Sequence, residues 1–152
     1  MYQKILVPLD GSETAVCTLA HTRTIAQGCQ VPEVTLLRVV EPLPTVYSTY
    51  GLAGDLLSGA QEKAQTEAKD YLSKQAEYLR KDGISVETAL ATGKAADEIL
   101  DYASKNQTDL IIMCTHGTSG IHRWAMGSVA DKVLRHSRVP VLLVPPAGSR
   151  SN

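Results

Sequence analysis

The sequence predicts an α/β fold: an open, doubly wound parallel sheet of five strands with helices on both faces. Five short, nearly continuous apolar runs alternate with four segments of helical spacing. Such runs are typical of strands buried on both sides, as in a parallel sheet covered by helices. Alternation of this kind favours right-handed crossovers. The 152 residues have the size of one ordinary domain, and we expect a single domain over residues 1–146 with a flexible tail over 147–152.

The first half of the chain holds two strands and one helix. The strands are the apolar runs 5–9 and 34–40. Between them, residues 13–28 place their apolar side chains on one face of a helix, and Ser12 is the expected N-cap. A long connection follows over 41–57 with two prolines and two glycines, and a loop of this length in a compact domain is usually functional.

Helices and strands continue to alternate in the second half. Residues 58–81 carry alanine or leucine every three or four positions, with Lys, Glu and Gln on the opposite face. The run 84–90 alternates apolar and polar residues and is the weakest strand, whereas 110–114 is the strongest. The segments 95–105 and 128–136 again have the spacing of amphipathic helices.

The last run, 139–144, predicts both a place in the sheet and a partner. Pro140 favours an edge strand because proline cannot donate to a central ladder. The following residues are all apolar, and a bare apolar edge invites pairing with another chain. We therefore expect a symmetric homodimer through residues 139–144.

Composition excludes several classes of function. Fifteen Lys and Arg against sixteen Asp and Glu give a net charge of −1, whereas a general nucleic-acid binder carries a strong positive excess. The three cysteines form no CxxC pair, which argues against a disulfide framework and suits a reducing compartment. No apolar run approaches the roughly 18 residues of a membrane span. Asp10 and Glu13 lie where a signal peptide needs its apolar core, so we expect a cytoplasmic protein.

Two strand-to-helix turns carry the candidate chemistry, because ligands of open α/β sheets bind at the carboxyl ends of the strands. Asp10-Gly-Ser12 follows the first strand, and Cys114-Thr-His-Gly117, nine residues and Gly127-Ser128 follow the fourth. The N–H groups at the start of the helix 128–136 form an anion site to which Ser128 can donate. A carboxylate such as Asp10 accepts ribose hydroxyls or holds a metal that bridges to phosphate. Alternatively, the glycines only make turns and Ser128, with Asp131 three residues later, only caps the helix.

Other kinds of site are not supported. The Walker A, G-x-G-x-x-G and G-x-S-x-G patterns are absent. Cys114, His116 and His122 match no zinc spacing, so we expect no metal site from them, and His116 is interpreted as a loop residue that touches phosphate or caps the turn. Strong catalysis is not expected, since no general base with a clear partner stands beside the phosphate site; Asp10 and His116 are the remaining candidates.

These motifs resemble the universal stress protein family. The resemblance rests on Lys4-Ile-Leu-Val-Pro-Leu-Asp10-Gly-Ser12, on Met113-Cys-Thr-His-Gly117 with Gly127-Ser128, and on the run 139–144. It implies a Rossmann-like sheet of the adenine nucleotide alpha hydrolase type with strand order 3-2-1-4-5. It also implies ATP or AMP, with Mg²⁺ as a candidate companion, across the ends of the first and fourth strands, and a homodimer.

The resemblance assigns roles residue by residue. Asp10 would face the ribose, and the backbone of Val39 would meet the adenine. The phosphates would meet Gly117, Gly127, Ser128 and Val129, and the pocket would be lined by Pro8, Leu9 and Met113, with Thr115 and His116 in the turn after the fourth strand. Cys114 stands where the nucleotide-binding branch has the first glycine of G-x2-G-x9-G-[ST]. Its Cβ and sulfur are expected to crowd the ribose or to shift the strand end, and a positive φ there would be costly.

Three functions follow from this reading. The leading one is a cytoplasmic stress-response protein that binds ATP or AMP and acts as a nucleotide-dependent regulatory dimer with an unknown protein partner. The second, motivated by Cys114 and the apolar fifth strand, is a nucleotide-free dimeric interaction module. The third is a weak ATP phosphohydrolase, with slow hydrolysis or self-phosphorylation at most.

Overall fold

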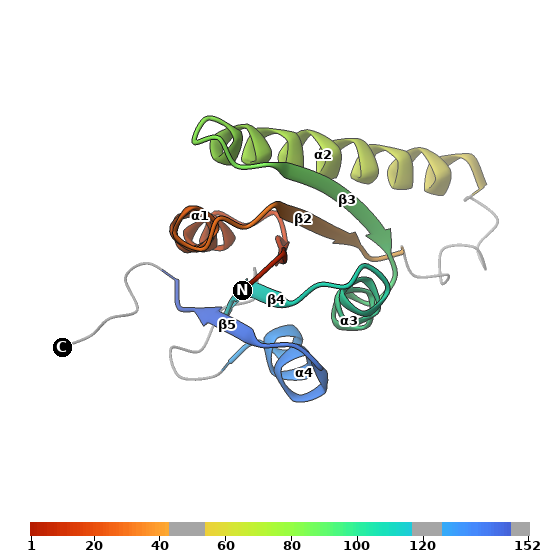
Figure 1. The fold of residues 1–152 in the computed structure, drawn as a ribbon. Helices are drawn as coiled ribbons and strands as arrows, with labels where there is room; N and C mark the ends of the chain where they lie inside the picture. Colours follow the sequence, from red (N-terminus) through yellow and green to blue (C-terminus); the bar gives the residue numbers. More distant parts are fainter. Residues whose placement is uncertain (43–53, 117–125, 147–152) are drawn as a thin grey trace.

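The computed structural model describes residues 1–42, 54–116 and 126–146. Within them, five parallel strands form one sheet of order β3-β2-β1-β4-β5 (Figure 1). The strands are β1 (Lys4–Pro8), β2 (Glu33–Val40), β3 (Val86–Thr92), β4 (Leu110–Cys114) and β5 (Val141–Val144). The helices are the 3-10 turn η1 (Thr14–Val16), α1 (Cys17–Gly28), α2 (Gly54–Arg80), α3 (Ala95–Lys105) and α4 (Ser128–His136). The predicted fold class and strand order are confirmed.

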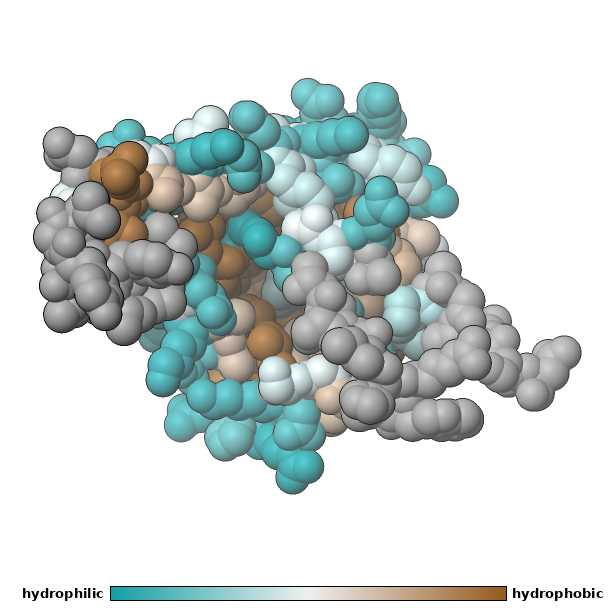
Figure 2. Space-filling view, turned by 180° about the vertical axis from the view of Figure 1, so that it is seen from behind, coloured by the Kyte–Doolittle hydropathy of each residue, from teal (hydrophilic) through white to brown (hydrophobic). Residues whose placement is uncertain are grey.

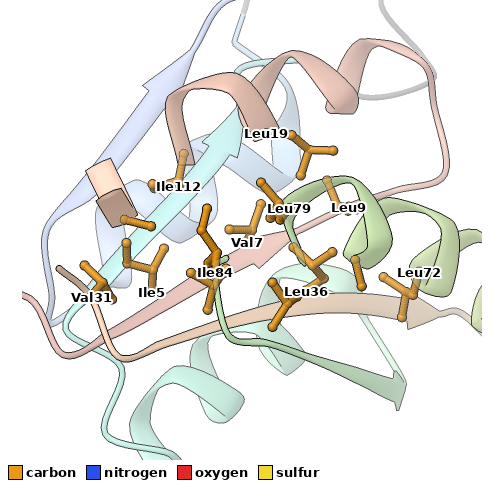
Figure 3. Packing of buried hydrophobic residues seen from close by; sticks show 14 of the residues in the cluster. Ile5, Val7, Leu9, Leu19, Val31, Leu36, Leu72, Leu79, Ile84 and Ile112 are labelled. Atoms are coloured by element: carbon orange, nitrogen blue, oxygen red, sulfur yellow. The ribbon is translucent and has the colours of Figure 1, made fainter. Parts of the chain in front are cut away.

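Helices cover the sheet on both faces, with α1 and α2 on one side and α3 and α4 on the other (Figure 1). Neighbouring strand residues point to opposite faces. Ile5 and Val7 of β1 accordingly pack with Leu19 of α1 and Leu79 of α2 (Figure 3), whereas Leu6 joins the core beneath α3 and α4. Because both faces are covered, the central strands are apolar without interruption.

Element boundaries differ from the predictions where pairing or a turn decides them. The first helix starts as the 3-10 turn η1, and α2 starts four residues earlier than the spacing indicated. β3 begins at Val86 instead of residue 84, because the turn at Gly83 (φ +76°) precedes it and pairing with β2 starts at Val86↔Val34. The helices α3 and α4 and the strand β4 have the predicted bounds.

The strand β5 lies at the edge of the sheet, as Pro140 predicted. It pairs with β4 from Ile111↔Val141 to Cys114↔Val144. Val141, Leu142 and Leu143 are half-buried, and Val144 is buried. In the part of the chain that the structure describes, no helix is both long enough and apolar enough to cross a membrane. The predicted tail 147–152 lies outside the described residues.

Candidate functional site

The strand order creates a crevice between the carboxyl ends of β1 and β4. β2 and β3 lie on one side of β1, and β4 and β5 lie on the other side, so the direction in which strands are added reverses between β1 and β4. β1 pairs with β2 over five residues but with β4 only at Ile5↔Leu110 and Leu6↔Ile111. The two strands therefore part toward their carboxyl ends, which is where the candidate turns lie.

Pro8 explains why they part. The carbonyl of Lys4 accepts from Asp109 N–H (3.0 Å), whereas Leu9 N–H donates to the carbonyl of Leu37 (2.9 Å). Every second residue of a strand forms its backbone hydrogen bonds with the same neighbouring strand, so Pro8, like Lys4, faces β4. Since proline has no N–H, it cannot extend the ladder on that side.

The first turn is organised by Asp10. Its Oδ1 accepts from the backbone N–H of Ser12 (2.9 Å) and from the Ser12 hydroxyl. The Ser12 Oγ accepts in turn from Ala15 N–H (3.2 Å), and Ala15 lies in η1. The predicted capping role of Ser12 is therefore performed on η1, because the N-cap position of α1 is Val16, which makes no side-chain capping bond.

An arginine that was not predicted as a site residue packs against this turn. The Nη1 of Arg38 donates to the carbonyl of Leu9 (3.5 Å). Gly11 has φ +86°, and a Cβ added there would lie 3.2 Å from Arg38 Nη2. The turn thus needs glycine for its left-handed backbone and for the close approach of the guanidinium. The available signal was the single charge inside the apolar run 34–40.

Tyr71 on α2 closes the side of this turn. Its hydroxyl donates to the carbonyl of Ser12 (3.4 Å). Burial raises the pKa of Tyr71 above its ordinary value, the negative charge of Asp10 raises it further, and the positive charge of Arg38 opposes the rise. A carboxylate, a guanidinium and a phenol therefore meet at the carboxyl ends of β1 and β2.

The second turn follows β4 and is held to the start of α4. The N–H of Thr115 donates to the carbonyl of Val144 (3.0 Å), and the N–H of Gly127 donates to the carbonyl of Thr115 (2.8 Å). The Thr115 hydroxyl shares a hydrogen bond with Nδ1 of His116 (2.9 Å). The Nε2 of His116 is buried and has no hydrogen-bond partner among the described residues. A buried polar atom left in this way is costly unless a ligand or water meets it.

The start of α4 carries no side-chain cap, which corrects the capping-box interpretation. Gly127 occupies the N-cap position, so Ser128 is the first helical residue and makes no capping bond. The N–H of Asp131 bonds to the carbonyl of Gly127, and its carboxylate bonds to Arg135 (2.9 Å) instead of reaching back. The N–H groups of the first turn therefore lie at a helix start suited to an anion.

Cys114 does not have the strained backbone that was considered for it. It is the last residue of β4 and pairs with Val144, and the non-glycine residues with positive φ in the described ranges are Gln30 and Gln107. Its Sγ lies 4.0 Å from Sγ of Cys17, so its side chain is directed at the start of α1. Replacing glycine by cysteine here is thus compatible with a regular strand.

Both turns border one cavity of about 490 Å³, within the range of small-molecule sites. Figure 2 shows a hollow with apolar residues inside and hydrophilic residues around it. The sequence-predicted residues that line the cavity are Pro8, Leu9, Asp10, Val39, Met113, Cys114, Thr115, His116, Gly127, Ser128 and Val129. Gly117 and His122 lie outside the described residues. The lining residues that sequence reasoning missed are Ala15, Leu37, Arg38, Val40, Glu41, Ala95, Ile99 and Ala130.

Val39 borders the cavity because β2 extends beyond the carboxyl end of β1. The last pair between these strands is Pro8↔Leu37, while Val39 stays in register with Ala91 of β3. The carbonyl of Leu37 points toward β1, and Val39, two residues later, points the same way. The backbone N–H and C=O of Val39 therefore face the space beyond the end of β1. Such edges offer one donor and one acceptor to a planar ligand.

Within residues 1–42, 54–116 and 126–146, no group of three or more His, Cys, Asp or Glu side chains is arranged to hold a metal ion. The arrangement can instead bind an anion at the start of α4 and an apolar group against Met113 and Leu37. Asp10 and Arg38 add one negative and one positive charge to the same lining.

Comparison with known proteins finds relatives that are similar to this chain in sequence and in structure. The universal stress protein MJ0531 of Methanocaldococcus jannaschii is 33% identical over 144 residues, covering 95% of this chain and 82% of that protein. The solved structure of MJ0577, a universal stress protein of the same organism, has a TM-score of 0.83 at 31% identity and covers 100% of this chain and 99% of that one. The universal stress protein from Archaeoglobus fulgidus in complex with dAMP has a TM-score of 0.67 at 25% identity, covering 93% and 97%. Residues 1–145 match the model of the universal stress protein family.

Proposed function

Because the chain belongs to the universal stress protein family, we propose that it binds ATP or AMP in the cavity between β1 and β4. The observation that carries the proposal is the convergence of two turns, more than 100 residues apart in the sequence, on one cavity that combines an apolar wall with an uncapped helix start. The A. fulgidus relative, whose structure is a complex with dAMP, supports an adenine nucleotide as the ligand class.

Each wall has a role in this proposal. The phosphates lie at the first turn of α4, where Ser128 and Val129 present backbone N–H groups beside Gly127, whose own N–H is bonded to the carbonyl of Thr115. Gly117, which follows His116 in the sequence, is the remaining phosphate residue. Nε2 of His116 gains the partner that it lacks among the described residues. Asp10 accepts from the ribose hydroxyls, and the backbone of Val39 meets the adenine edge.

The remaining residues shape the pocket. Pro8, Leu9 and Met113 form its apolar lining, and Thr115 positions both His116 and Gly127 through its hydroxyl and its carbonyl. Cys114 contributes the end of β4. When Mg²⁺ accompanies ATP, the carboxylate of Asp10 is the oxygen ligand type that this ion prefers.

Calorimetric titration with ATP and AMP, each with and without Mg²⁺, tests the proposal. Ser128→Ala removes a hydroxyl donor to a phosphate, and since hydrogen bonds to charged groups contribute about 1.5–3 kcal/mol, we expect affinity to fall about tenfold or more. Ser104→Ala on the exposed side of α3 is the matched control and should bind as the unmodified protein does. Absence of heat and of a thermal shift at millimolar nucleotide would reject nucleotide binding and favour the nucleotide-free interaction module.

The role of Asp10 is tested by Asp10→Asn. The amide oxygen can still accept from Ser12 N–H, so the turn is kept while the charge is lost. Affinity should fall for both nucleotides, and Asp70→Asn on the exposed face of α2 should have no effect. Multiple turnover of ATP that this substitution abolishes would instead support the weak phosphohydrolase.

We further propose a cytoplasmic homodimer that responds to stress through its nucleotide occupancy and an unknown protein partner. The residues 139–144 support the dimer because β5, within the described residues, pairs with β4 alone and carries three half-buried apolar residues. Light scattering coupled to size-exclusion chromatography should give twice the monomer mass, and Leu142→Lys should give the monomer mass. A monomeric unmodified protein would reject this part.

A further inference from the structure

Two cysteines that are distant in the sequence meet beside the cavity, which Cys114 lines. Cys17 is the first residue of α1, and Cys114 is the last residue of β4. Their Sγ atoms lie 4.0 Å apart, and both side chains are half-buried. The third cysteine, Cys29, lies just beyond the other end of α1, about 18 Å from Cys17 at 1.5 Å per helical residue.

We propose that Cys17 and Cys114 are a redox modification site: a peroxide oxidises the two thiols to a disulfide, and this disulfide lowers the affinity of the cavity for nucleotide. The first part stands on the sulfur geometry alone. The second part rests on the proposed nucleotide binding.

The chemistry balances without any group other than the peroxide. One thiolate attacks a peroxide oxygen, the O–O bond breaks, and a sulfenic acid and one water result once protons are counted. The second thiolate attacks the sulfenic sulfur and expels hydroxide, which leaves as a second water. Two thiols and one hydrogen peroxide thus give one disulfide and two waters. A neighbouring thiol is what directs a sulfenic acid toward a disulfide instead of further oxidation.

The bond requires a modest movement. An S–S bond is about 2.05 Å long, so the sulfurs must approach by about 2 Å. Cys114 is held in β4 by its pairing with Val144, whereas Cys17 follows a 3-10 turn directly and starts a helix whose N-cap makes no side-chain bond. We expect the η1–α1 junction to supply most of the movement, because a helix start without a cap is the less constrained partner.

Movement at either sulfur reaches the cavity. On one side, Ala15 lies two residues before Cys17, lines the cavity and bonds to the Ser12 hydroxyl, which is bonded to Asp10. On the other side, Thr115 follows Cys114, and its carbonyl holds Gly127 N–H at 2.8 Å. A disulfide would therefore pull together the two walls that the proposed function assigns to ribose and phosphate.

The chemical part is tested on the full-length protein with hydrogen peroxide. After treatment, alkylation under denaturing conditions and intact mass spectrometry should show a loss of two hydrogens and one alkylated cysteine. Peptide mapping should link Cys17 to Cys114. Cys29→Ser should form the same disulfide and leave no thiol to alkylate, Cys17→Ser should form no intramolecular disulfide, and dithiothreitol should restore all three thiols of the unmodified protein. A disulfide between two copies of Cys29, or equal slow oxidation of all three thiols, would overturn the proposal.

The regulatory part is tested by titrating reduced and oxidised protein with ATP. We expect affinity to be about tenfold weaker after oxidation, since sites tolerate displacements of only about 0.5 Å, and Cys17→Ser should keep its affinity after the same treatment. A disulfide that forms without changing affinity overturns the regulatory part alone. If the reduced protein binds no nucleotide, the proposed function and its regulation both fail while the thiol pair stands.

Discussion

Gly11 offers a test that separates backbone strain from side-chain contact. Its φ of +86° belongs to the left-handed region, where a residue with a Cβ costs roughly 1–2 kcal/mol. A Cβ would also lie 3.2 Å from Nη2 and 3.3 Å from Cζ of Arg38, so the guanidinium must give way by a few tenths of an ångström. Gly11→Ala should therefore destabilise the fold and disturb the turn that holds Asp10.

Gly83 provides the matched control. Its φ of +76° is nearly the same, but a Cβ there would have no heavy atom within 4 Å. Gly83→Ala should thus cost the backbone term alone, roughly 1–2 kcal/mol. Gly11→Ala should cost this amount plus up to about 1 kcal/mol, because the bond from Arg38 to the Leu9 carbonyl is already long at 3.5 Å and contributes modestly. Each kcal/mol lowers Tm by roughly 2–4 °C in a chain of this size.

Urea unfolding and calorimetric titration with ATP together decide the outcome. Gly83→Ala should retain nucleotide affinity, while Gly11→Ala should weaken it because Gly11 adjoins Asp10. Gly28→Ala, which ends α1 without a positive φ and with open space around it, should be neutral or stabilising. If both positive-φ variants are as stable as Gly28→Ala, the left-handed backbone carries no strain. If Gly11→Ala is no less stable than Gly83→Ala, the contact with Arg38 adds no cost. If the two variants bind ATP equally well, the turn at Gly11 does not act on the cavity through Asp10.

Three further measurements probe the core and the charges. Ile112→Ala should cost about 2–5 kcal/mol in urea unfolding, because this side chain of β4 is fully buried in the core that it shares with Val7 and Leu19. Because the pKa of Tyr71 is raised in the folded state, its neutral phenol contributes fully to stability below pH 10.0, and this contribution is lost as the pH rises further. The free energy of unfolding of Tyr71→Phe should therefore fall less steeply with rising pH than that of the unmodified protein. The pKa of Asp97 is lowered, chiefly by its bond to Lys132, so Lys132→Met should shift the NMR titration of this carboxyl back toward 3.8; an unchanged midpoint would contradict the ion pair.

The elements that sequence reasoning located to the residue are those with the strongest patterns. The run Leu110–Cys114 is uniformly apolar because β4 is buried on both faces, and α3 and α4 have clear amphipathic spacing. Boundaries failed where a distant partner sets them. β3 starts where β2 offers a pair, and β1 ends where Pro8 stops the ladder, and neither partner is visible in a local pattern.

The position of the candidate site could be predicted mainly from the topology of the sheet. Carboxyl ends of parallel strands share one edge of the sheet, so the turns after β1 and β4 had to lie close together. Contributions from side chains that reach across the edge were missed: Arg38 arrives from β2, and Ala95 and Ile99 arrive from α3. The predicted capping box at Ser128 was wrong by one residue, because Gly127 occupies the N-cap position. Residue spacing alone does not fix the end of a helix to a single residue.

Cys114 shows how a departure from a motif acquires a consequence once its surroundings are known. From the sequence, it was a side chain that would crowd a ribose. In the structure, β4 places the cysteine in ordinary strand conformation with its sulfur toward α1, 4.0 Å from the sulfur of Cys17. The end of β4 thus keeps a regular backbone, and Cys114 lines the cavity with its sulfur next to that of Cys17. Glycine at this position could not form the disulfide that we propose, whereas cysteine places a thiol 4.0 Å from that of Cys17.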